Sequence, residues 1–197
     1  MLEPDEIHLW RLDLGRWNGT GAELTPEERE RAARFRFPDL QRRWTAGRAE
    51  LRRLLDRYTG IPAADLRFAY GEHGKPYLAG SRVRFNMTDS GDLVFYAVTL
   101  DAEIGVDVER FREIDGAGIA RRYLPADEAA AVLDDPACFF RVWTRREAYL
   151  KCLGIGLRRI DTPFAAGYSI ADFEPAPGYA GAAVWEGPGR RLSIRDL

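Results

Sequence analysis

Asp107 and Glu109 are two carboxylates that a β-strand would place on the same face. They lie in the sequence IGVDVE, where the two-residue period of a strand puts Ile104, Val106 and Val108 on the opposite face. Like charges at that spacing repel, and either an arginine or a divalent cation bound by oxygen ligands relieves the repulsion. The motif alone is compatible with a metal site and with an ordinary solvated strand face.

Glu147 and Lys151 form a second pair that could do chemistry. They follow Trp143 at intervals of four residues, so all three side chains project from one face of a helix. On an exposed helix such a pair contributes only ~0.2–0.5 kcal/mol. This helix also carries a series of apolar residues, namely Phe139, Phe140, Val142, Tyr149 and Leu150. Much of it should be buried, which makes a third carboxylate near the strand pair plausible.

Three carboxylates around one Mg²⁺ would leave coordination positions for water and for the oxygens of a phosphate ligand. Zinc is not indicated, because the chain has only two histidines, two cysteines and no CxxC or HExxH motif. Neither a P-loop nor a GxGxxG loop occurs, so the phosphate contacts must come from side chains.

Basic residues are concentrated in the first third of the chain. Between Arg29 and Arg57 ten arginines face four acidic residues, a net charge of +6, whereas the whole chain carries −2. An anionic ligand fits this excess, and so does a solvated helix face. Nucleic acid would also fit the charge, but no nucleic-acid-binding signature accompanies it. Only two of the 29 basic residues are lysines, Lys75 and Lys151, which invites a chemical reason for them.

The first half reads as a strand, two helices and then extended segments. The strand covers residues 7 to 12, and a helix begins at Pro26 with Thr25 as N-cap and Glu28 completing a capping box. A second, apolar-striped helix follows Pro38 and ends at Gly60. Strands are expected at residues 66–70, in VRFNM and in LVFYAVTL, which would pack on this helix.

The second half repeats the order of helix and then strands. A boundary between residues 101 and 102 divides the chain into halves 1–101 and 102–197, the second opening with the GVDVE strand. Beyond Gly116 the pattern is helical, and a long helix runs from about Pro136 to a cap at Gly154. Short strands follow at residues 168–173, 182–185 and 192–194. The fold class is therefore α+β.

The composition indicates a soluble globular protein. The chain has 197 residues, of which 46% are hydrophobic, enough for one sizeable core or two small ones. No apolar run approaches the ~20 residues that span a bilayer, and the N-terminus lacks the basic start of a signal peptide. We expect a cytoplasmic location and no membrane partner.

Four motifs in order, GKPYL, FNMTDSG, GVDVE and WTRREAYLK, resemble the surfactin-synthetase type of 4'-phosphopantetheinyl transferase. The resemblance extends from about residue 26 to 157 and includes TPEERERAARF and the following RRW. It implies two pseudo-symmetric halves, each with a small sheet on a long helix. Coenzyme A and Mg²⁺ would lie between an N-terminal half that binds coenzyme A and a C-terminal half that carries the metal and catalytic residues.

The resemblance also implies a role for individual residues. Asp107, Glu109 and Glu147 would hold Mg²⁺, while Glu147 as base and Lys151 as phosphate contact would be catalytic. The residues implied to bind coenzyme A are Arg31, Arg43, Gly74, Lys75, Thr88, Asp89 and Lys151. Lys75 and Arg43 would bind its 3'-phosphate end, with Arg31 assisting. Both lysines thus fall on motif positions.

The implied reaction moves phosphopantetheine from coenzyme A to a serine of an apo acyl or peptidyl carrier protein, releasing 3',5'-adenosine bisphosphate. The partners are then coenzyme A and the carrier, not nucleic acid, and the two-halves-in-one-chain form favours a monomer.

Asp89 departs from the family pattern, because it replaces the histidine of the FNxSHS motif. A carboxylate ~4 Å from a diphosphate would cost on the order of 1–4 kcal/mol unless it is protonated, turned away or bridged by a cation. We expect activity to survive; the alternative is a protein that binds coenzyme A or a carrier without efficient transfer. Arg146 also replaces a usual lysine, which keeps a cation but changes its geometry.

Overall fold

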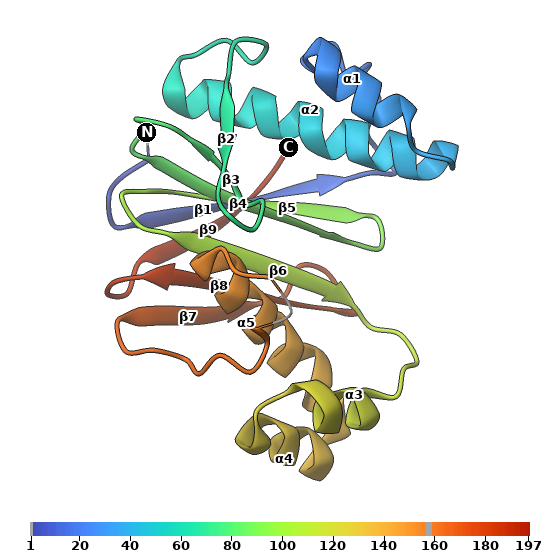
Figure 1. The fold of residues 1–197 in the computed structure, drawn as a ribbon, viewed down its shortest axis with the longest axis vertical. Helices are drawn as coiled ribbons and strands as arrows, with labels where there is room; N and C mark the ends of the chain where they lie inside the picture. Colours follow the sequence, from blue (N-terminus) through green and yellow to red (C-terminus); the bar gives the residue numbers. More distant parts are fainter. Residues whose placement is uncertain (1, 157–158) are drawn as a thin grey trace.

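The computed structural model describes residues 2–156 and 159–197. Leu157, the last residue of the segment that resembles the transferase family, lies outside the described residues. α2 (Pro38–Thr59) packs on one face of the first sheet, the second sheet packs on the other face, and α5 (Phe139–Leu153) packs on the far face of the second sheet. α3 (Gly116–Tyr123) and α4 (Ala126–Asp134) lie at the end of the molecule far from α2 (Figure 1). None of the described helices is long and apolar enough to cross a membrane.

Both helices of the first half begin where the sequence predicts, and α2 also ends where predicted, whereas α1 ends at Ala33, short of the interruption expected at Pro38. α1 (Pro26–Ala33) has Thr25 as N-cap, and the capping box with Glu28 is formed. α2 (Pro38–Thr59) ends at Gly60, whose φ of 69° is the left-handed conformation that glycine adopts without strain.

The first sheet has the strand order β4-β5-β1-β9. β1 (Glu6–Asp13), β4 (Val83–Ser90) and β5 (Leu93–Leu100) come from the first half. The apolar stripe of α2, with Leu51 and Leu54, packs on Phe85 and Tyr96 of this sheet. The short hairpin of β2 (Phe68–Tyr70) and β3 (Pro76–Leu78) lies beside it.

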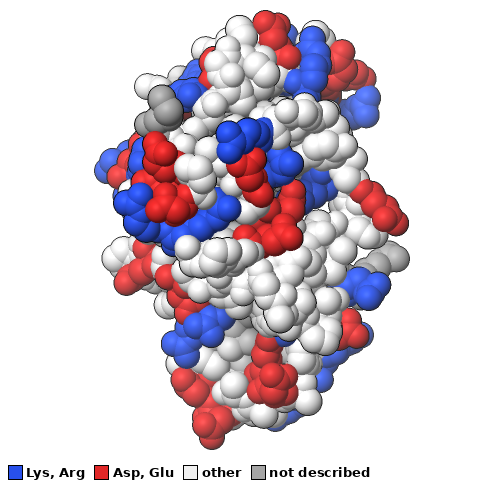
Figure 2. Space-filling view, turned by 90° about the vertical axis from the view of Figure 1, so that its left-hand side faces the viewer, with Lys and Arg blue, Asp and Glu red and all other residues white. Residues whose placement is uncertain are grey.

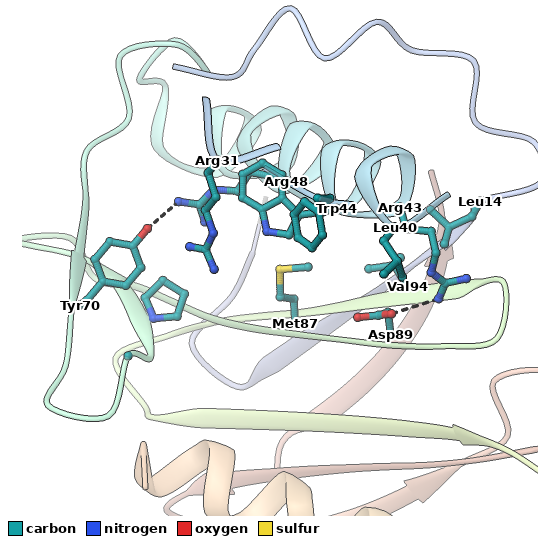
Figure 3. Close-up of a pocket in the computed structure, with 14 residues that line it drawn as sticks. Leu14, Arg31, Leu40, Arg43, Trp44, Arg48, Tyr70, Met87, Asp89 and Val94 are labelled. Carbon is teal, nitrogen blue, oxygen red and sulfur yellow. Dashed lines mark hydrogen bonds and ion pairs between the residues drawn. The ribbon is translucent and has the colours of Figure 1, made fainter. Parts of the chain in front are cut away.

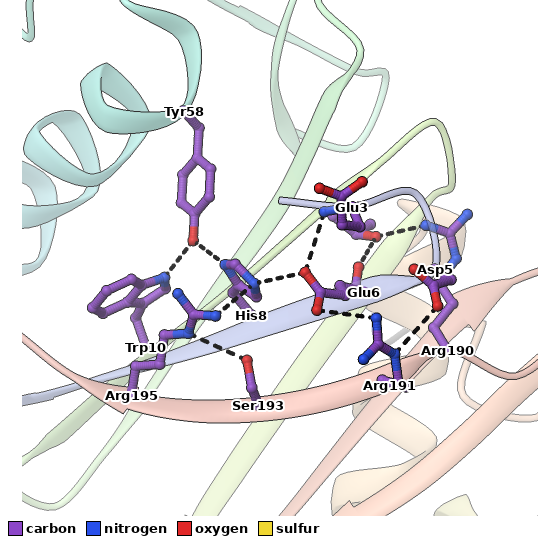
Figure 4. Close-up of polar contacts among 11 residues, drawn as sticks. Glu3, Asp5, Glu6, His8, Trp10, Tyr58, Arg190, Arg191, Ser193 and Arg195 are labelled. Atoms are coloured by element: carbon purple, nitrogen blue, oxygen red, sulfur yellow. Dashed lines mark hydrogen bonds and ion pairs between the residues drawn. The ribbon is translucent and has the colours of Figure 1, made fainter. Parts of the chain in front are cut away.

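β9 (Arg191–Asp196) belongs to the sheet of the first half, because it pairs in parallel with β1. Side chains reinforce the pairing: Arg195 Nη2 lies 2.8 Å from His8 Nε2, and His8 Nδ1 lies 2.6 Å from the Tyr58 hydroxyl of α2 (Figure 4). Burial, with the adjacent Arg195, lowers the pKa of His8. The division of the chain at residues 101/102 stays a prediction. β9 lies after that boundary in the sequence, yet it belongs to the sheet of the first half.

The second sheet has the order β6-β8-β7, from β6 (Ile104–Arg110), β7 (Tyr168–Phe173) and β8 (Tyr179–Glu186). After β6 the chain leaves the sheet and forms α3 (Gly116–Tyr123), α4 (Ala126–Asp134) and a 3₁₀ turn, Pro136–Cys138, before α5. α5 (Phe139–Leu153) therefore starts three residues later than the sequence suggests, and it ends at Gly154 as expected. It packs on β6 and β8.

The prediction for the GVDVE strand is confirmed. Ile104, Val106 and Val108 are buried in the core between the two sheets, with Phe95 and Ala97 of β5 opposite. Each sheet carries one long helix on its outer face, and the α+β class is confirmed.

Candidate active site

β4 separates a ligand pocket from a group of carboxylates, because its side chains alternate between the two. Met87 and Asp89 line the pocket. Asn86, Thr88 and Ser90 face β6 instead, where the Asn86 side-chain oxygen accepts a hydrogen bond of 3.0 Å from the Val106 N–H. The FNMTDSG motif thus serves two sites through the two-residue period of a strand.

Asp107 is the centre of the carboxylate group. Its Oδ1 accepts hydrogen bonds from Lys151 Nζ at 2.6 Å and from the Thr88 hydroxyl at 2.9 Å. The same hydroxyl accepts from Lys151 Nζ at 3.0 Å, and Glu147 Oε2 lies 3.8 Å from that ammonium. Strand β6 and helix α5 thereby bring Asp107, Glu147 and Lys151 together as predicted.

The second oxygen of Asp107, Oδ2, is buried and has no hydrogen-bond partner among the described residues. Burial raises the pKa of Asp107 to about 7, opposed by the Lys151 ammonium and assisted by the charge of Glu147. A buried carboxylate oxygen without a partner is unfavourable. A cation at Oδ2 would remove that cost.

Glu109 points to different partners. Its Oε2 accepts from the Ser90 hydroxyl at 2.9 Å and from Arg112 Nη1 at 2.7 Å. Accordingly, residues 2–156 and 159–197 contain no group of three or more His, Cys, Asp or Glu placed to hold a metal ion. Asp107 and Glu147 offer the carboxylate oxygens that Mg²⁺ prefers, and Asp107 Oδ2 has no other partner among the described residues. Glu109 as a metal ligand stays a prediction.

The ligand pocket lies under the N-terminal part of α2 and has a volume of about 370 Å³. Its walls carry cations and aromatic rings, as Figure 3 shows for Arg31, Arg43, Arg48, Trp44 and Tyr70. The guanidinium of Arg31 lies 5.4 Å from the centre of the Trp44 ring. Such walls suit an anionic ligand with an aromatic or apolar part.

Asp89 is bridged by a cation. Its Oδ2 accepts a hydrogen bond of 3.1 Å from Arg43 Nη2, at the end of the pocket shown in Figure 3. The carboxylate and the guanidinium are 55% and 28% exposed, so solvent screens the pair. Of the outcomes foreseen for a carboxylate at this position, the structure shows the ion pair.

Three residues that the resemblance assigns to coenzyme A have separate positions. Gly74 lines the pocket, with a φ of 83°. Thr88 is buried on the other side of β4, against Asp107. The Lys75 side chain reaches Glu103 and does not line this pocket. For Lys75 and Thr88 a direct contact with coenzyme A stays a prediction.

Arg146 serves the fold of the second half. Its guanidinium is 2% exposed, donates to the Glu128 carboxylate of α4 and to the Thr162 carbonyl, and lies 4.5 Å from the centre of the Phe164 ring. The replacement of a lysine at this position therefore leaves the carboxylate group untouched.

Sequence reasoning missed Asn86, Ser90 and Arg112, which position β6 and Glu109. The first two had a readable signal, since they alternate with pocket residues along one strand. Arg112 had none, because its contact depends on the path of the chain after β6.

Fold and site define an α+β protein with a cation-lined pocket one strand away from a buried carboxylate and an ammonium. Two family models match the chain: "4'-phosphopantetheinyl transferase, N-terminal" over residues 8–101 and "4'-phosphopantetheinyl transferase superfamily" over residues 103–191. The chain is 39% identical to the 4'-phosphopantetheinyl transferase HetI of Nostoc sp. over 174 residues, covering 81% of this chain and 73% of HetI.

Two Bacillus proteins extend the comparison. The 4'-phosphopantetheinyl transferase psf-1 of Bacillus pumilus is 36% identical, over 66% of this chain and 58% of psf-1. The 4'-phosphopantetheinyl transferase Sfp of Bacillus subtilis is 29% identical, over 68% of this chain and 62% of Sfp. The chain belongs to the 4'-phosphopantetheinyl transferase superfamily, a family of enzymes.

Proposed function

We propose that this protein transfers the 4'-phosphopantetheine group of coenzyme A to a serine of an apo acyl or peptidyl carrier protein, with Mg²⁺ as cofactor. The observation that carries the proposal is the buried Asp107, whose Oδ1 is held by Lys151 and Thr88 while Oδ2 has no partner among the described residues. This group lies one strand from a pocket lined by arginines and aromatic rings.

Coenzyme A is the ligand that we assign to the pocket. Its phosphates carry the negative charge that Arg31 and Arg43 can bind through charge-assisted hydrogen bonds. Its adenine ring has a flat apolar face suited to Trp44 or Tyr70. The Gly74 main chain forms part of the same wall.

Asp107 and Glu147 would hold Mg²⁺, and the family resemblance adds Glu109. When bound, the ion would neutralise negative charge on the diphosphate. Lys151, whose ammonium already contacts Asp107, would stabilise the charge that develops on the leaving phosphate.

In the transfer, the serine oxygen forms a bond to the β-phosphorus of coenzyme A. The bond from that phosphorus to the bridging oxygen breaks, and 3',5'-adenosine bisphosphate leaves with the electron pair. Glu147 is the candidate to accept the serine proton, because its carboxylate lies at the edge of the carboxylate group with 17% of its surface exposed.

Asp89 supports two versions of this function. Its ion pair with Arg43 prevents an unpaired carboxylate from facing the diphosphate, which favours an active enzyme. The same pair occupies an arginine that would bind a phosphate, which favours the alternative of a homologue that binds coenzyme A or a carrier with little transfer. If that alternative is correct, Asp89→His should restore turnover.

The finer assignments belong to the same proposal. We propose that the protein is a transferase of the surfactin-synthetase type, a monomer in the cytoplasm, and that nucleic acid is not a ligand. Ion pairs support the last point: Arg48 and Arg52 bind Glu28, and Arg53 binds Glu23 and Glu50. On the face shown in Figure 2, basic residues are interleaved with acidic ones.

The deciding experiment is mass spectrometry of apo carrier proteins incubated with the protein, coenzyme A and Mg²⁺. The proposal predicts that the carrier gains the mass of one phosphopantetheine, and that a carrier with alanine for its acceptor serine gains nothing. The absence of a mass gain on several carriers, each modified by another transferase in parallel, would refute it.

A further inference from the structure

The ammonium of Lys75 is fully occupied by acceptors of the second half. It donates to Glu103 Oε2 at 2.6 Å, to the Ile104 carbonyl at 3.0 Å and to the Cys152 carbonyl at 2.9 Å. A lysine ammonium has three N–H donors, and each has a partner here. The side chain is only 15% exposed. No donor remains for the phosphate of a ligand in this arrangement.

The acceptors of Lys75 belong to the two elements that carry the carboxylate group. Ile104 is the first residue of β6, three residues before Asp107. Cys152 lies in the last turn of α5, directly after Lys151, where helix carbonyls lack partners within the helix. A cation at this end of the helix is favoured by the helix dipole.

β6 and α5 form one closely packed unit at this point. A Cβ atom added to Gly105 would lie 2.0 Å from the Ala148 carbonyl oxygen and 2.4 Å from the Cys152 nitrogen. Only glycine permits this approach of helix to strand. A residue that contacts this unit is therefore held in a fixed position relative to both Asp107 and Lys151.

Whereas the Lys75 side chain contacts β6 and α5, the main chain on either side of Lys75 forms part of the wall of the ligand pocket. The loop is closed by hydrogen bonds from Gly71 N to the Lys75 carbonyl and from Gly74 N to the Gly71 carbonyl, both 2.9 Å. Gly74 and Pro76 line the pocket, whereas the Lys75 side chain borders a separate cavity of about 320 Å³. Lys75 thus joins the pocket wall to the unit formed by β6 and α5.

We propose that Lys75 is a positioning residue, which fixes the wall of the ligand pocket to β6 and α5, and that it does not bind a phosphate of the ligand. The proposal rests on the proposed function for the identity of that ligand as coenzyme A. Its physical basis is that a displacement of about 1 Å between substrate and catalytic groups can cost ~100-fold in rate.

The test compares Lys75→Met with the wild-type protein, using coenzyme A and 3'-dephospho-coenzyme A as substrates with an apo carrier. At a temperature where circular dichroism shows the variant folded, kcat should fall ~10- to 100-fold for both substrates by the same factor. The KM for each should stay within about threefold, since the pocket cations are unchanged. Glu103→Gln should reproduce a smaller part of the loss, because both carbonyl acceptors remain.

Two outcomes would overturn the proposal. If Lys75→Met impairs the reaction of coenzyme A but not that of the dephospho analogue, Lys75 binds the 3'-phosphate. If only the thermal midpoint falls and kcat is unchanged, Lys75 has a purely structural role.

Inactivity of the wild-type protein with both substrates would instead refute the proposed function. In that case, amide hydrogen exchange tests the positioning role of Lys75 independently of activity. Exchange of the amides of residues 71–75 and of the last turn of α5 should become at least about tenfold faster in Lys75→Met, because the contact that joins them is lost. Unchanged exchange in both segments would overturn the proposal.

Discussion

Two buried carboxylates, Glu28 and Asp107, lie among cations in the two halves of the molecule, and they differ in how they are satisfied. Glu28 accepts from Arg48 Nε at Oε1, from Arg52 at both oxygens and from the Thr25 N–H at Oε2. Asp107 accepts from Lys151 and Thr88 at Oδ1 and has nothing at Oδ2 among the described residues.

The two pKa values move in opposite directions. Burial acts to raise the pKa of Glu28, but the hydrogen bonds and charges of Arg52 and Arg48 outweigh it, so the pKa is lowered from 4.5. At Asp107 burial prevails, and its pKa rises to about 7. A satisfied carboxylate stabilises the fold, whereas an unsatisfied one is available to a ligand. We therefore assign a structural role to Glu28 and a functional role to Asp107.

The largest expected effect is that of Asp107→Asn on transfer. The substitution keeps the shape of the side chain and removes the charge, so kcat/KM should fall at least ~1,000-fold, as several kcal/mol of charge stabilisation are lost. Phosphopantetheine incorporation into a carrier measures this. Asp172→Asn, in an ion pair with Arg145 and separated from β6 by strand β8, is the matched control and should leave the rate unchanged. A fully active Asp107→Asn variant would remove Asp107 from the site.

Glu28→Gln should show the reverse pattern, with a large effect on stability. Glutamine keeps the capping box but leaves Arg48 and Arg52 without a counter-charge, which should cost about 3 kcal/mol in the free energy of unfolding. Urea denaturation measures it. For Asp107→Asn the same measurement should change by less than about 1 kcal/mol, because a partly unsatisfied charge is removed.

The pH dependence of the Glu28 contribution has a definite sign. Because its pKa is lowered on folding, the stabilisation is complete above its ordinary value of 4.5 and is lost as the pH falls through the folded-state value. The stability difference between the wild type and Glu28→Gln should therefore shrink as the pH is lowered below about 4.5. A difference that grows on acidification would contradict this account.

Glu147→Gln should lower kcat by ~100-fold, within the range for loss of a general base. The amide is similar in size, so coenzyme A binding, measured by calorimetry, should change little. An equal loss with Glu109→Gln would show that both act at the metal, whereas a milder loss would agree with the Ser90 and Arg112 contacts of Glu109.

The smallest effect is expected for Asp89→Asn. Releasing Arg43 from its ion pair should tighten coenzyme A binding by about two- to fivefold, because exposed pairs contribute up to ~1 kcal/mol. Asp92→Asn is the control, since that carboxylate lies 3.9 Å from Arg43 and is 72% exposed. Weaker binding in Asp89→Asn would mean that Asp89 orients Arg43 for the ligand.

The local parts of the fold could be predicted from the sequence. Thr25 and Glu28 at the start of α1 and Gly154 at the end of α5 act through neighbouring backbone groups. The shared face of Glu147 and Lys151 follows from helical periodicity in the same way.

Contacts between distant segments could not be predicted. β9 returns to the sheet of the first half, 185 residues from its ion-pair partner on β1, and no local signal encodes that pairing. The direction of the Lys75 side chain depends on acceptors in β6 and α5. The hydrogen bonds to the Glu28 carboxylate likewise depend on arginines of α2. The motif positions were therefore easier to find than the partners that decide their roles.

Binding of Mn²⁺, as a substitute for Mg²⁺, tests most directly whether the free oxygen of Asp107 makes a metal site. Electron paramagnetic resonance of the protein with coenzyme A, titrated with Mn²⁺, should show one bound ion per chain in the wild type. Asp107→Asn should bind at least about tenfold more weakly while circular dichroism shows it folded. Equal Mn²⁺ affinity in the wild type and in Asp107→Asn would contradict the functional role assigned to Asp107.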